Sequence, residues 1–204
     1  MMADIFASDD NSTPLTPEEK EGLKLKWISL RGELNEAETR NIFDAERWLA
    51  SRKPGNILND SFLRILHGKM FGQVWKWAGE FRNTERNIGV APHQIPMKLK
   101  ALFDDVEFWI DNSVFPRVEI AVRLHHRLVL IHPFPNGNGR ISRLMADLLM
   151  ERFGERRLHW GEGNLSDITE LRSRYIDALR CADNGDYCKL IDFVTGGAAG
   201  RSPL

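Results

Sequence analysis

An abrupt break between two apolar segments constrains the fold of this chain more than any other feature. Residues 118–131 and 141–153 both have the apolar pattern of helices. Between them stands His-Pro-Phe-Pro-Asn-Gly-Asn-Gly-Arg, from His132 to Arg140, with two prolines and two glycines in nine residues. Such a segment is typical of a loop. The chain is therefore expected to contain two core helices joined by a polar, flexible junction.

The residue types in this junction are those that a phosphate site needs. Gly137, Asn138 and Gly139 can turn successive backbone N–H groups inward to cradle an anion. A helix that begins near Gly139 adds the positive end of its dipole. Arg140 would lie in the first turn and Arg143 one turn later on the same face, where their forked donors suit phosphate oxygens. This arrangement favours a di- or triphosphate over a single phosphate.

Three further residues of the junction have expected roles. His132 can take a proton from an attacking hydroxyl near pH 7, and Phe134 is expected to be a buried anchor that orients the loop. Asn136 offers a side-chain carbonyl, which is a weak ligand for Mg²⁺ on bound phosphates. The alternative is an ordinary loop, because Asn-Gly sequences are common between helices. The junction is not a P-loop, since no Lys-Ser or Lys-Thr pair follows the glycines.

Length and composition limit the class of protein. The 204 residues fit one domain with room for a small accessory lobe, and 42% apolar and 28% charged residues are ordinary for a globular chain. The net charge of −1 gives no basic field, so we predict neither nucleic acid nor a membrane surface as a direct partner. We expect a cytoplasmic location, because no apolar run reaches the roughly 18 residues of a membrane span and the N-terminus does not resemble a secretory signal.

The chain divides into four expected parts. Residues 1–14 are predicted to be a disordered lead, 15–30 an N-terminal helical extension, 31–195 the main domain and 196–204 a flexible tail. The main domain is predicted to be mainly α, a helical bundle with one short β-hairpin where asparagine, glycine and proline interrupt the apolar pattern. The hairpin is expected within residues 81–96, and helices within residues 33–51, 59–70, 97–112, 118–131, 139–153, 166–181 and 187–194.

These segments resemble a known family. The segment from His132 to Arg143 is similar to the Fic signature, H-P-F-x-[D/E]-G-N-G-R-x-x-R, and matches every specified position except Asn136. Residues 75–82, W-K-W-A-G-E-F-R, resemble the segment that precedes the flap hairpin of the family, and residues 175–194 resemble its closing helices. The N-terminal part looks most like a Fic subgroup named mobile mystery protein B.

The resemblance implies an α-helical enzyme that transfers AMP from ATP, with Mg²⁺, to a hydroxyl group of a target protein. By this analogy His132 would be the general base. The segment Gly137 to Gly139 would form the anion hole for the α- and β-phosphates. Arg140 would hold the β-phosphate and Arg143 the γ-phosphate.

The resemblance also suggests how the target and the metal are held. Asn87, Ile88 and Gly89 would form the flap that pairs with the target backbone. Asn136 would stand at the Mg²⁺ position, where the Asp or Glu of the family brings a full negative charge and Asn brings only a dipole. Three outcomes stay open: a slower AMP transferase, an enzyme that prefers another nucleotide or metal or transfers another NMP or phosphate, and a degenerate nucleotide- or protein-binding module.

Regulation is a separate question. Many Fic proteins carry an inhibitory helix, [S/T]-x-x-x-E-[G/N], whose glutamate pairs with the second arginine of the signature. Here Glu21-Gly22 precedes the domain, although Pro17 stands at the Ser/Thr position. Glu21 is therefore a candidate to reach Arg143 and block γ-phosphate binding, and the alternative is a glutamate on a solvated helix face. Other Fic subgroups are controlled by a separate antitoxin protein, so an antitoxin partner is a further expectation, and oligomerisation stays open.

Overall fold

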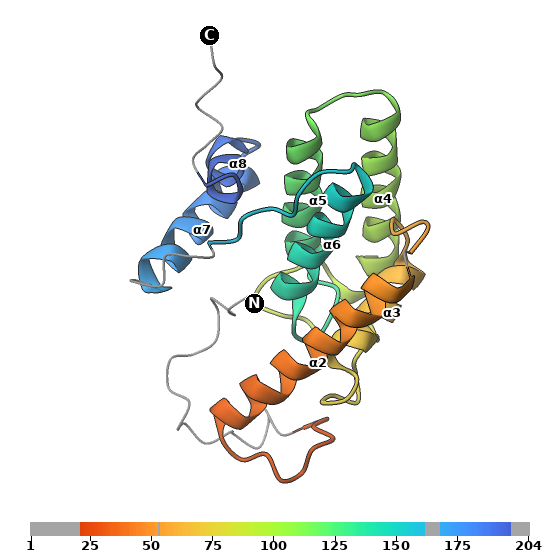
Figure 1. Cartoon of the computed structure of the whole chain (residues 1–204), viewed down its shortest axis with the longest axis vertical. Helices are drawn as coiled ribbons and strands as arrows, with labels where there is room; N and C mark the ends of the chain where they lie inside the picture. Colours follow the sequence, from red (N-terminus) through yellow and green to blue (C-terminus); the bar gives the residue numbers. More distant parts are fainter. Residues whose placement is uncertain (1–20, 53, 162–167, 197–204) are drawn as a thin grey trace.

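A computed structural model describes residues 21–52, 54–161 and 168–196 of the chain (Figure 1). This part is mainly helical, as predicted, and no β-strand occurs in it. In chain order its elements are α2 (Arg31–Arg52), α3 (Asp60–Phe71), the 3₁₀ turn η1 (Pro92–Gln94), α4 (Ile95–Asp111), α5 (Arg117–Ile131), α6 (Asn138–Arg152), α7 (Ile168–Asp183) and α8 (Cys188–Val194).

Helices α5 and α6 form the centre of the fold. They pack along each other, α4 packs against α5, and the α7–α8 pair reaches α5 through α8 (Figure 1). Leu124 and Leu128 of α5 and Met145 and Leu149 of α6 are buried between these layers. Because burying each such side chain contributes about 1.5–3 kcal/mol, the two helices form a stable base for the junction that joins them.

The junction begins and ends in left-handed backbone. His132, the C-cap of α5, has φ 52°, and its N–H donates to the Leu128 carbonyl at 3.0 Å. Gly137, the N-cap of α6, has φ 77°. Left-handed backbone costs a residue with a Cβ about 1–2 kcal/mol, so tertiary contacts must hold His132 in place. Phe134 is fully buried between these two points, as the sequence predicted.

Helices α2 and α3 pack against each other, and α3 also contacts α6. The start of α3 is set locally, because the Asn59 side chain accepts a hydrogen bond from the N–H of Phe62 at 2.8 Å. One turn apart on α3, His67 and Phe71 are buried and face the junction beside Gly137. Helix α3 therefore supports the junction through these buried side chains.

The predicted β-hairpin does not form: residues 81–91 are an irregular loop. The side chain of Arg82 explains the difference. It is buried and donates to the carbonyls of Thr84, at 2.9 Å, and Val90, and its Nε donates to the His132 carbonyl at 2.6 Å. In a hairpin such carbonyls would accept from N–H groups of the opposite strand. Here one guanidinium joins the two arms and ties them to His132.

The expected N-terminal helix is also not found in residues 21–30, which form turns and an isolated bridge between Leu23 and Trp75. The N–H of Lys24 donates to Val74 at 2.8 Å, and the N–H of Lys76 donates to Gly22 at 2.9 Å. Backbone groups that pair with a distant segment are not available for helical hydrogen bonds. Residues 1–20, with the predicted lead and the first part of the expected helical extension, and residues 197–204 of the predicted tail lie outside the described residues, so a helix before residue 21 stays a prediction.

Candidate functional site

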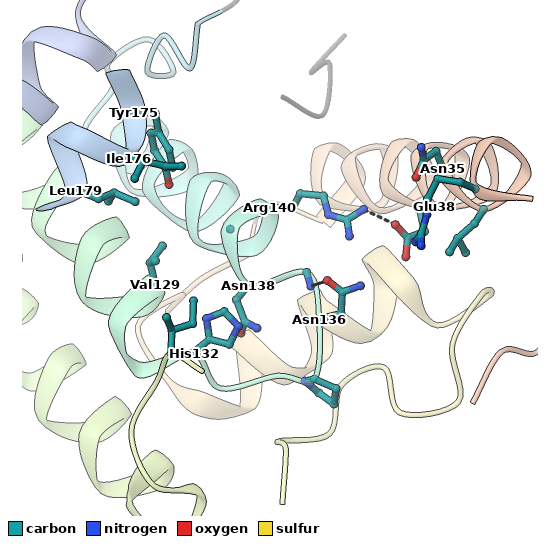
Figure 2. Close-up of a pocket in the computed structure, with 16 residues that line it drawn as sticks. Asn35, Glu38, Val129, His132, Asn136, Asn138, Arg140, Tyr175, Ile176 and Leu179 are labelled. Atoms are coloured by element: carbon teal, nitrogen blue, oxygen red, sulfur yellow. Dashed lines mark hydrogen bonds and ion pairs between the residues drawn. The ribbon is translucent and has the colours of Figure 1, made fainter. Parts of the chain in front are cut away.

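A cavity of about 480 Å³ opens where the junction, the first turn of α6, α2 and α7 meet (Figure 2). Small-molecule sites commonly have volumes of about 300–1,000 Å³. Polar side chains come from the junction, from Arg140 and from α2, and apolar side chains come mainly from α5 and α7. The lining residues are Arg31, Leu34, Asn35, Glu38, Ile88, Val129, His132, Pro135, Asn136, Gly137, Asn138, Gly139, Arg140, Tyr175, Ile176 and Leu179.

The first turn of α6 turns backbone donors toward this cavity. The first hydrogen bond within α6 runs from the Ile141 N–H to the Gly137 carbonyl at 3.0 Å. The N–H groups of Asn138, Gly139 and Arg140 precede it, so they have no carbonyl partner within the helix. These groups carry the positive end of the helix dipole. The structure thus brings together the residues from which the sequence predicted an anion cradle, and phosphate binding there stays a prediction.

The two asparagines of the junction have different tasks. The buried Asn138 side chain accepts from the Phe134 N–H at 2.9 Å and donates to the Phe134 carbonyl at 2.8 Å, so it closes the loop. Asn136 folds over its own neighbour, and its Oδ1 accepts from the Gly137 N–H at 2.7 Å. A phosphate would therefore have to displace this contact to reach the Gly137 N–H, whereas a metal could use the second lone pair of Oδ1.

His132 lies at the other end of the junction and lines the same cavity. Burial lowers its pKa from the usual 6.5, because imidazolium loses solvation; the charges of Arg82 and Arg86 act in the same direction and the backbone at Val129 in the opposite one. At neutral pH the ring is therefore uncharged. An uncharged imidazole at the cavity wall is able to accept a proton.

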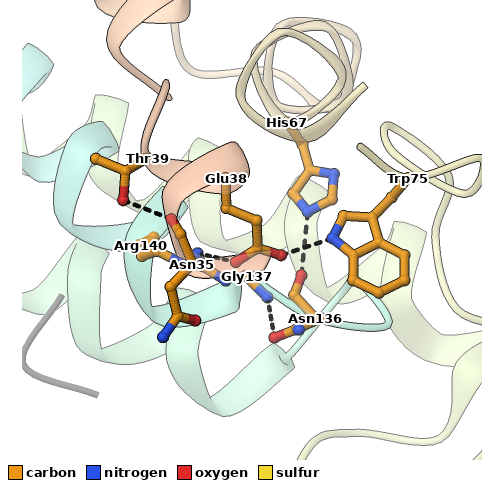
Figure 3. A network of polar contacts seen from close by, with 8 residues as sticks. All are labelled: Asn35, Glu38, Thr39, His67, Trp75, Asn136, Gly137 and Arg140. Atoms are coloured by element: carbon orange, nitrogen blue, oxygen red, sulfur yellow. Dashed lines mark hydrogen bonds and ion pairs between the residues drawn. The ribbon is translucent and has the colours of Figure 1, made fainter. Parts of the chain in front are cut away.

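Arg140 lines the cavity, and its guanidinium is paired with a carboxylate from another helix. Its Nη1 lies 2.5 Å from Oε2 of Glu38 on α2, while Oε1 of Glu38 accepts from Trp75 Nε1 at 2.6 Å (Figure 3). The guanidinium also lies 4.6 Å from the centre of the Phe71 ring. Glu38 was not among the residues predicted from the sequence. The only available signal was its spacing, four residues after Leu34 on the buried face of α2.

Arg143 does not line the cavity and is buried behind the first turn of α6. It interacts with the hydroxyl of Tyr175, which also contacts Nε2 of His125 at 2.8 Å. Burial lowers the pKa of His125 to about 3, and the charge of Arg143 adds to the effect. Burial raises the pKa of Tyr175 to about 12, although Arg143 favours the phenolate. A contact between Arg143 and a γ-phosphate therefore stays a prediction.

Of the three predicted flap residues, only Ile88 lines the cavity, and its side chain is exposed. Gly89 has φ 112°, and a Cβ there would lie 2.6 Å from the Arg82 guanidinium and 2.8 Å from Cβ of His132. The backbone at Gly89 thus passes directly beside His132. Asn87 is exposed and does not reach the cavity. Pairing of this loop with a target backbone is not tested by these contacts.

The structure does not place the candidate inhibitory residue beside its expected partner. Glu21 is exposed in a turn and makes no hydrogen bond or ion pair with Arg143 within the described residues. The pairing of residues 22–24 with residues 74–76 holds Glu21 away from a helical conformation. Among the described residues, Glu38 brings a carboxylate to a signature arginine, and it pairs with the first one, Arg140.

The described residues contain no group of three or more His, Cys, Asp or Glu side chains that could hold a metal ion. None of their helices combines the length and apolarity needed to cross a membrane.

Comparison with known proteins identifies a family domain within the chain. Residues 57–150 match the Fic/DOC family, so the chain contains a Fic/DOC family domain, as the sequence predicted. Curated relatives named protein adenylyltransferase Fic are 34% identical over 134 residues in Drosophila grimshawi and 31% over 133 residues in Aedes aegypti. Each alignment covers 63% of this chain, and the chain spans only about a quarter of those relatives, 26% and 25%.

Solved structures share the fold. Fic-1 from C. elegans superposes with a TM-score of 0.65 at 23% identity, covering 90% of this chain and 55% of that one. BepC from Bartonella tribocorum, with bound AMPPNP, gives 0.65 at 18% identity and coverages of 87% and 95%. An N-terminal Fic domain from Bartonella quintana, with bound ADP, gives 0.67 at 18% identity and coverages of 93% and 92%. The mobile mystery protein B subgroup is not shown by these comparisons and stays a prediction.

Proposed function

We propose that this chain is a protein adenylyltransferase that moves AMP from Mg·ATP to a hydroxyl side chain of a target protein. One observation carries the proposal: a single cavity holds the uncharged ring of His132, the backbone donors that begin α6, and Arg140. The curated relatives named protein adenylyltransferase Fic support it, as do the Bartonella Fic structures with bound AMPPNP and ADP.

The reaction is a nucleotidyl transfer. The target hydroxyl gives its proton to His132, and its oxygen bonds the α-phosphorus as the bond from that phosphorus to pyrophosphate breaks. The products are the AMP ester of the target and pyrophosphate. The first turn of α6, Arg140 and Arg143 would neutralise charge on the phosphates. Such reactions depend mainly on alignment and on charge stabilisation, which these groups supply.

The polar and apolar surfaces of the cavity suit the two ends of a nucleotide. Val129, next to His132, and Ile176 and Leu179 of α7 give apolar surface for a nucleoside (Figure 2). Mg²⁺ would enter with the phosphates and neutralise their charge. Asn136 offers it a hard but uncharged oxygen, which fits a metal that phosphate oxygens hold more than the protein does.

Labelled ATP tests the proposal. With label on the α-phosphate, the protein or its target should become labelled, and His132→Ala should abolish this labelling. His93→Ala is the matched control, because His93 is exposed in η1 and does not line the cavity. Label arriving only from the γ-phosphate would mean phosphorylation, and preference for another NTP would mean transfer of another NMP.

Binding of ATP in calorimetry, without transfer in Mg²⁺ or Mn²⁺, would support the alternative of a catalytically weak binding module. An antitoxin partner and an oligomeric form stay predictions from the resemblance.

A further inference from the structure

His67 lies under the junction and bridges two separate backbone segments. Its ring is fully buried, Nδ1 accepts from the Gly79 N–H at 2.9 Å, and Nε2 lies 3.1 Å from the Asn136 carbonyl. A backbone N–H only donates, so Nδ1 must be the acceptor and Nε2 carries the proton. Burial also lowers the pKa of His67 to about 3, which keeps the ring uncharged at pH 7. His67 therefore donates to the Asn136 carbonyl.

The surroundings of the ring leave it little freedom. It stacks on Phe134 with ring centroids 3.7 Å apart and an interplanar angle of 8°. One turn later on α3, Phe71 covers Gly137 so closely that a Cβ on Gly137 would lie 2.6 Å from its ring. The packing around the His67 ring therefore fixes the direction of its Nε2–H donor.

The Asn136–Gly137 peptide needs such a hold. In a trans peptide unit the carbonyl and the following N–H point in opposite directions. Fixing the Asn136 carbonyl toward α3 therefore aims the Gly137 N–H to the cavity side, where the Asn136 side chain now covers it (Figure 3). Gly137, with φ 77°, has the backbone freedom that would otherwise let this peptide rotate.

We propose that His67 is a positioning residue, whose Nε2–H fixes the Asn136–Gly137 peptide so that the Gly137 N–H faces the phosphate end of the cavity. His67 does not touch the substrate and acts through the loop. Its effect on nucleotide binding rests on the proposed function, whereas its effect on the loop does not.

Two substitutions separate the two hydrogen bonds of the ring. His67→Asn keeps an acceptor near the Nδ1 position for Gly79 and removes the donor to Asn136. His67→Gln keeps a donor near the Nε2 position and removes the acceptor for Gly79. In ¹⁵N relaxation, His67→Asn should lower the order parameter of the Gly137 amide from about 0.85 to below about 0.6 while Gly79 stays ordered, and His67→Gln should do the reverse.

Calorimetry gives the functional part. The Kd for ATP should rise roughly five- to tenfold in His67→Asn, as expected for one lost hydrogen bond, and should stay within about threefold in His67→Gln. Failure of the wild type to bind ATP would sink the proposed function, and the contrast between Gly137 and Gly79 would still decide the role of His67.

Other results would overturn the inference. If both variants lower the order parameters of both the Gly137 and the Gly79 amides in proportion to their loss of thermal stability, His67 only fills space. If neither variant folds, long-range ¹H–¹⁵N spectra of the wild type still decide, because a proton on Nδ1 or a charged ring would contradict the proposed donor.

Discussion

The ion pair between Glu38 and Arg140 places a protein carboxylate where an ATP phosphate would have to bind. The two side chains are only 6% and 16% exposed, so solvent screens their interaction weakly. Glu38 is held in place by Trp75 Nε1 through its other oxygen. In the proposed function Arg140 holds an ATP phosphate, so ATP would compete with Glu38 for the guanidinium, and we expect removal of the carboxylate charge to strengthen nucleotide binding.

The substitution Glu38→Gln gives the size of this effect. Glutamine keeps the shape and an oxygen acceptor, so α2 keeps its packing. Glutamine has one oxygen for the two donors Trp75 and Arg140 and carries no charge, so it loses the attraction between opposite charges even where its oxygen still accepts from Arg140. An exposed pair of this kind contributes up to about 1 kcal/mol and a buried one more. Competition for Arg140 should therefore weaken by roughly 1–1.5 kcal/mol, and the Kd for ATP should fall by about tenfold. Glu38→Ala is less informative, because breaking a buried pair costs about 3–5 kcal/mol of stability.

Calorimetry with a non-hydrolysable ATP analogue measures the change, and transfer of α-label should increase at subsaturating ATP. Glu21→Gln is the matched control, since Glu21 is exposed and makes no ion pair with Arg143, so its Kd should not change. The reasoning is refuted if Glu38→Gln binds the analogue no better than wild type while Arg140→Ala binds it worse. Glu38 would then position Arg140 for the nucleotide and not compete with it.

Three further changes test other parts of the site. Asn136→Asp should lower the Mg²⁺ concentration needed for half-maximal transfer, because a carboxylate brings full charge to the metal; an unchanged requirement would contradict a role for residue 136 at the metal. Gly137→Ala should lower the thermal unfolding midpoint more than Gly154→Ala. Gly154→Ala should lower the free energy of unfolding by about 1–2 kcal/mol. Both glycines have left-handed φ, 77° and 75°, but only at Gly137 would a Cβ meet a side chain, Phe71 at 2.6 Å. Equal shifts of the two unfolding midpoints would show that the loop moves to accommodate the Cβ. The rate of transfer should fall with decreasing pH only below 6.5, since burial lowers the pKa of His132 and only the uncharged ring accepts a proton; an acid limb above pH 6.5 in the pH–rate profile would argue against His132 as the base.

Most of the helices could be predicted because their limits are encoded by nearby residues. Asn59 caps α3 with its own side chain, and Pro116 stands just before α5, where its missing N–H costs nothing. Two described segments, residues 81–91 and residues 21–30, differ from their predictions because their backbone partners lie elsewhere in the chain. The arms of the expected hairpin are joined by Arg82, and residues 22–24 pair with residues 74–76 in place of forming a helix.

The candidate site likewise combines features set by neighbouring residues with features set by residues far apart in the sequence. His132, the glycines and Arg140 stand within nine residues of one another, so the sequence was enough to place a base candidate beside an anion-binding helix start. The partners of that loop come from other helices. Glu38 lies 102 residues from Arg140, and His67 lies 69 residues from Asn136.

Arg143 shows both effects, that of helical spacing in the sequence and that of packing in the folded chain. Helical spacing correctly puts it one turn after Arg140, yet packing of α7 buries it against Tyr175 and away from the cavity surface. Loop chemistry and helix limits depend on neighbours in the chain, and the amino-acid order therefore determines them. Which polar side chains are paired, buried or exposed depends on how the helices pack. For Glu38, His67 and Arg143, only the folded chain shows these surroundings.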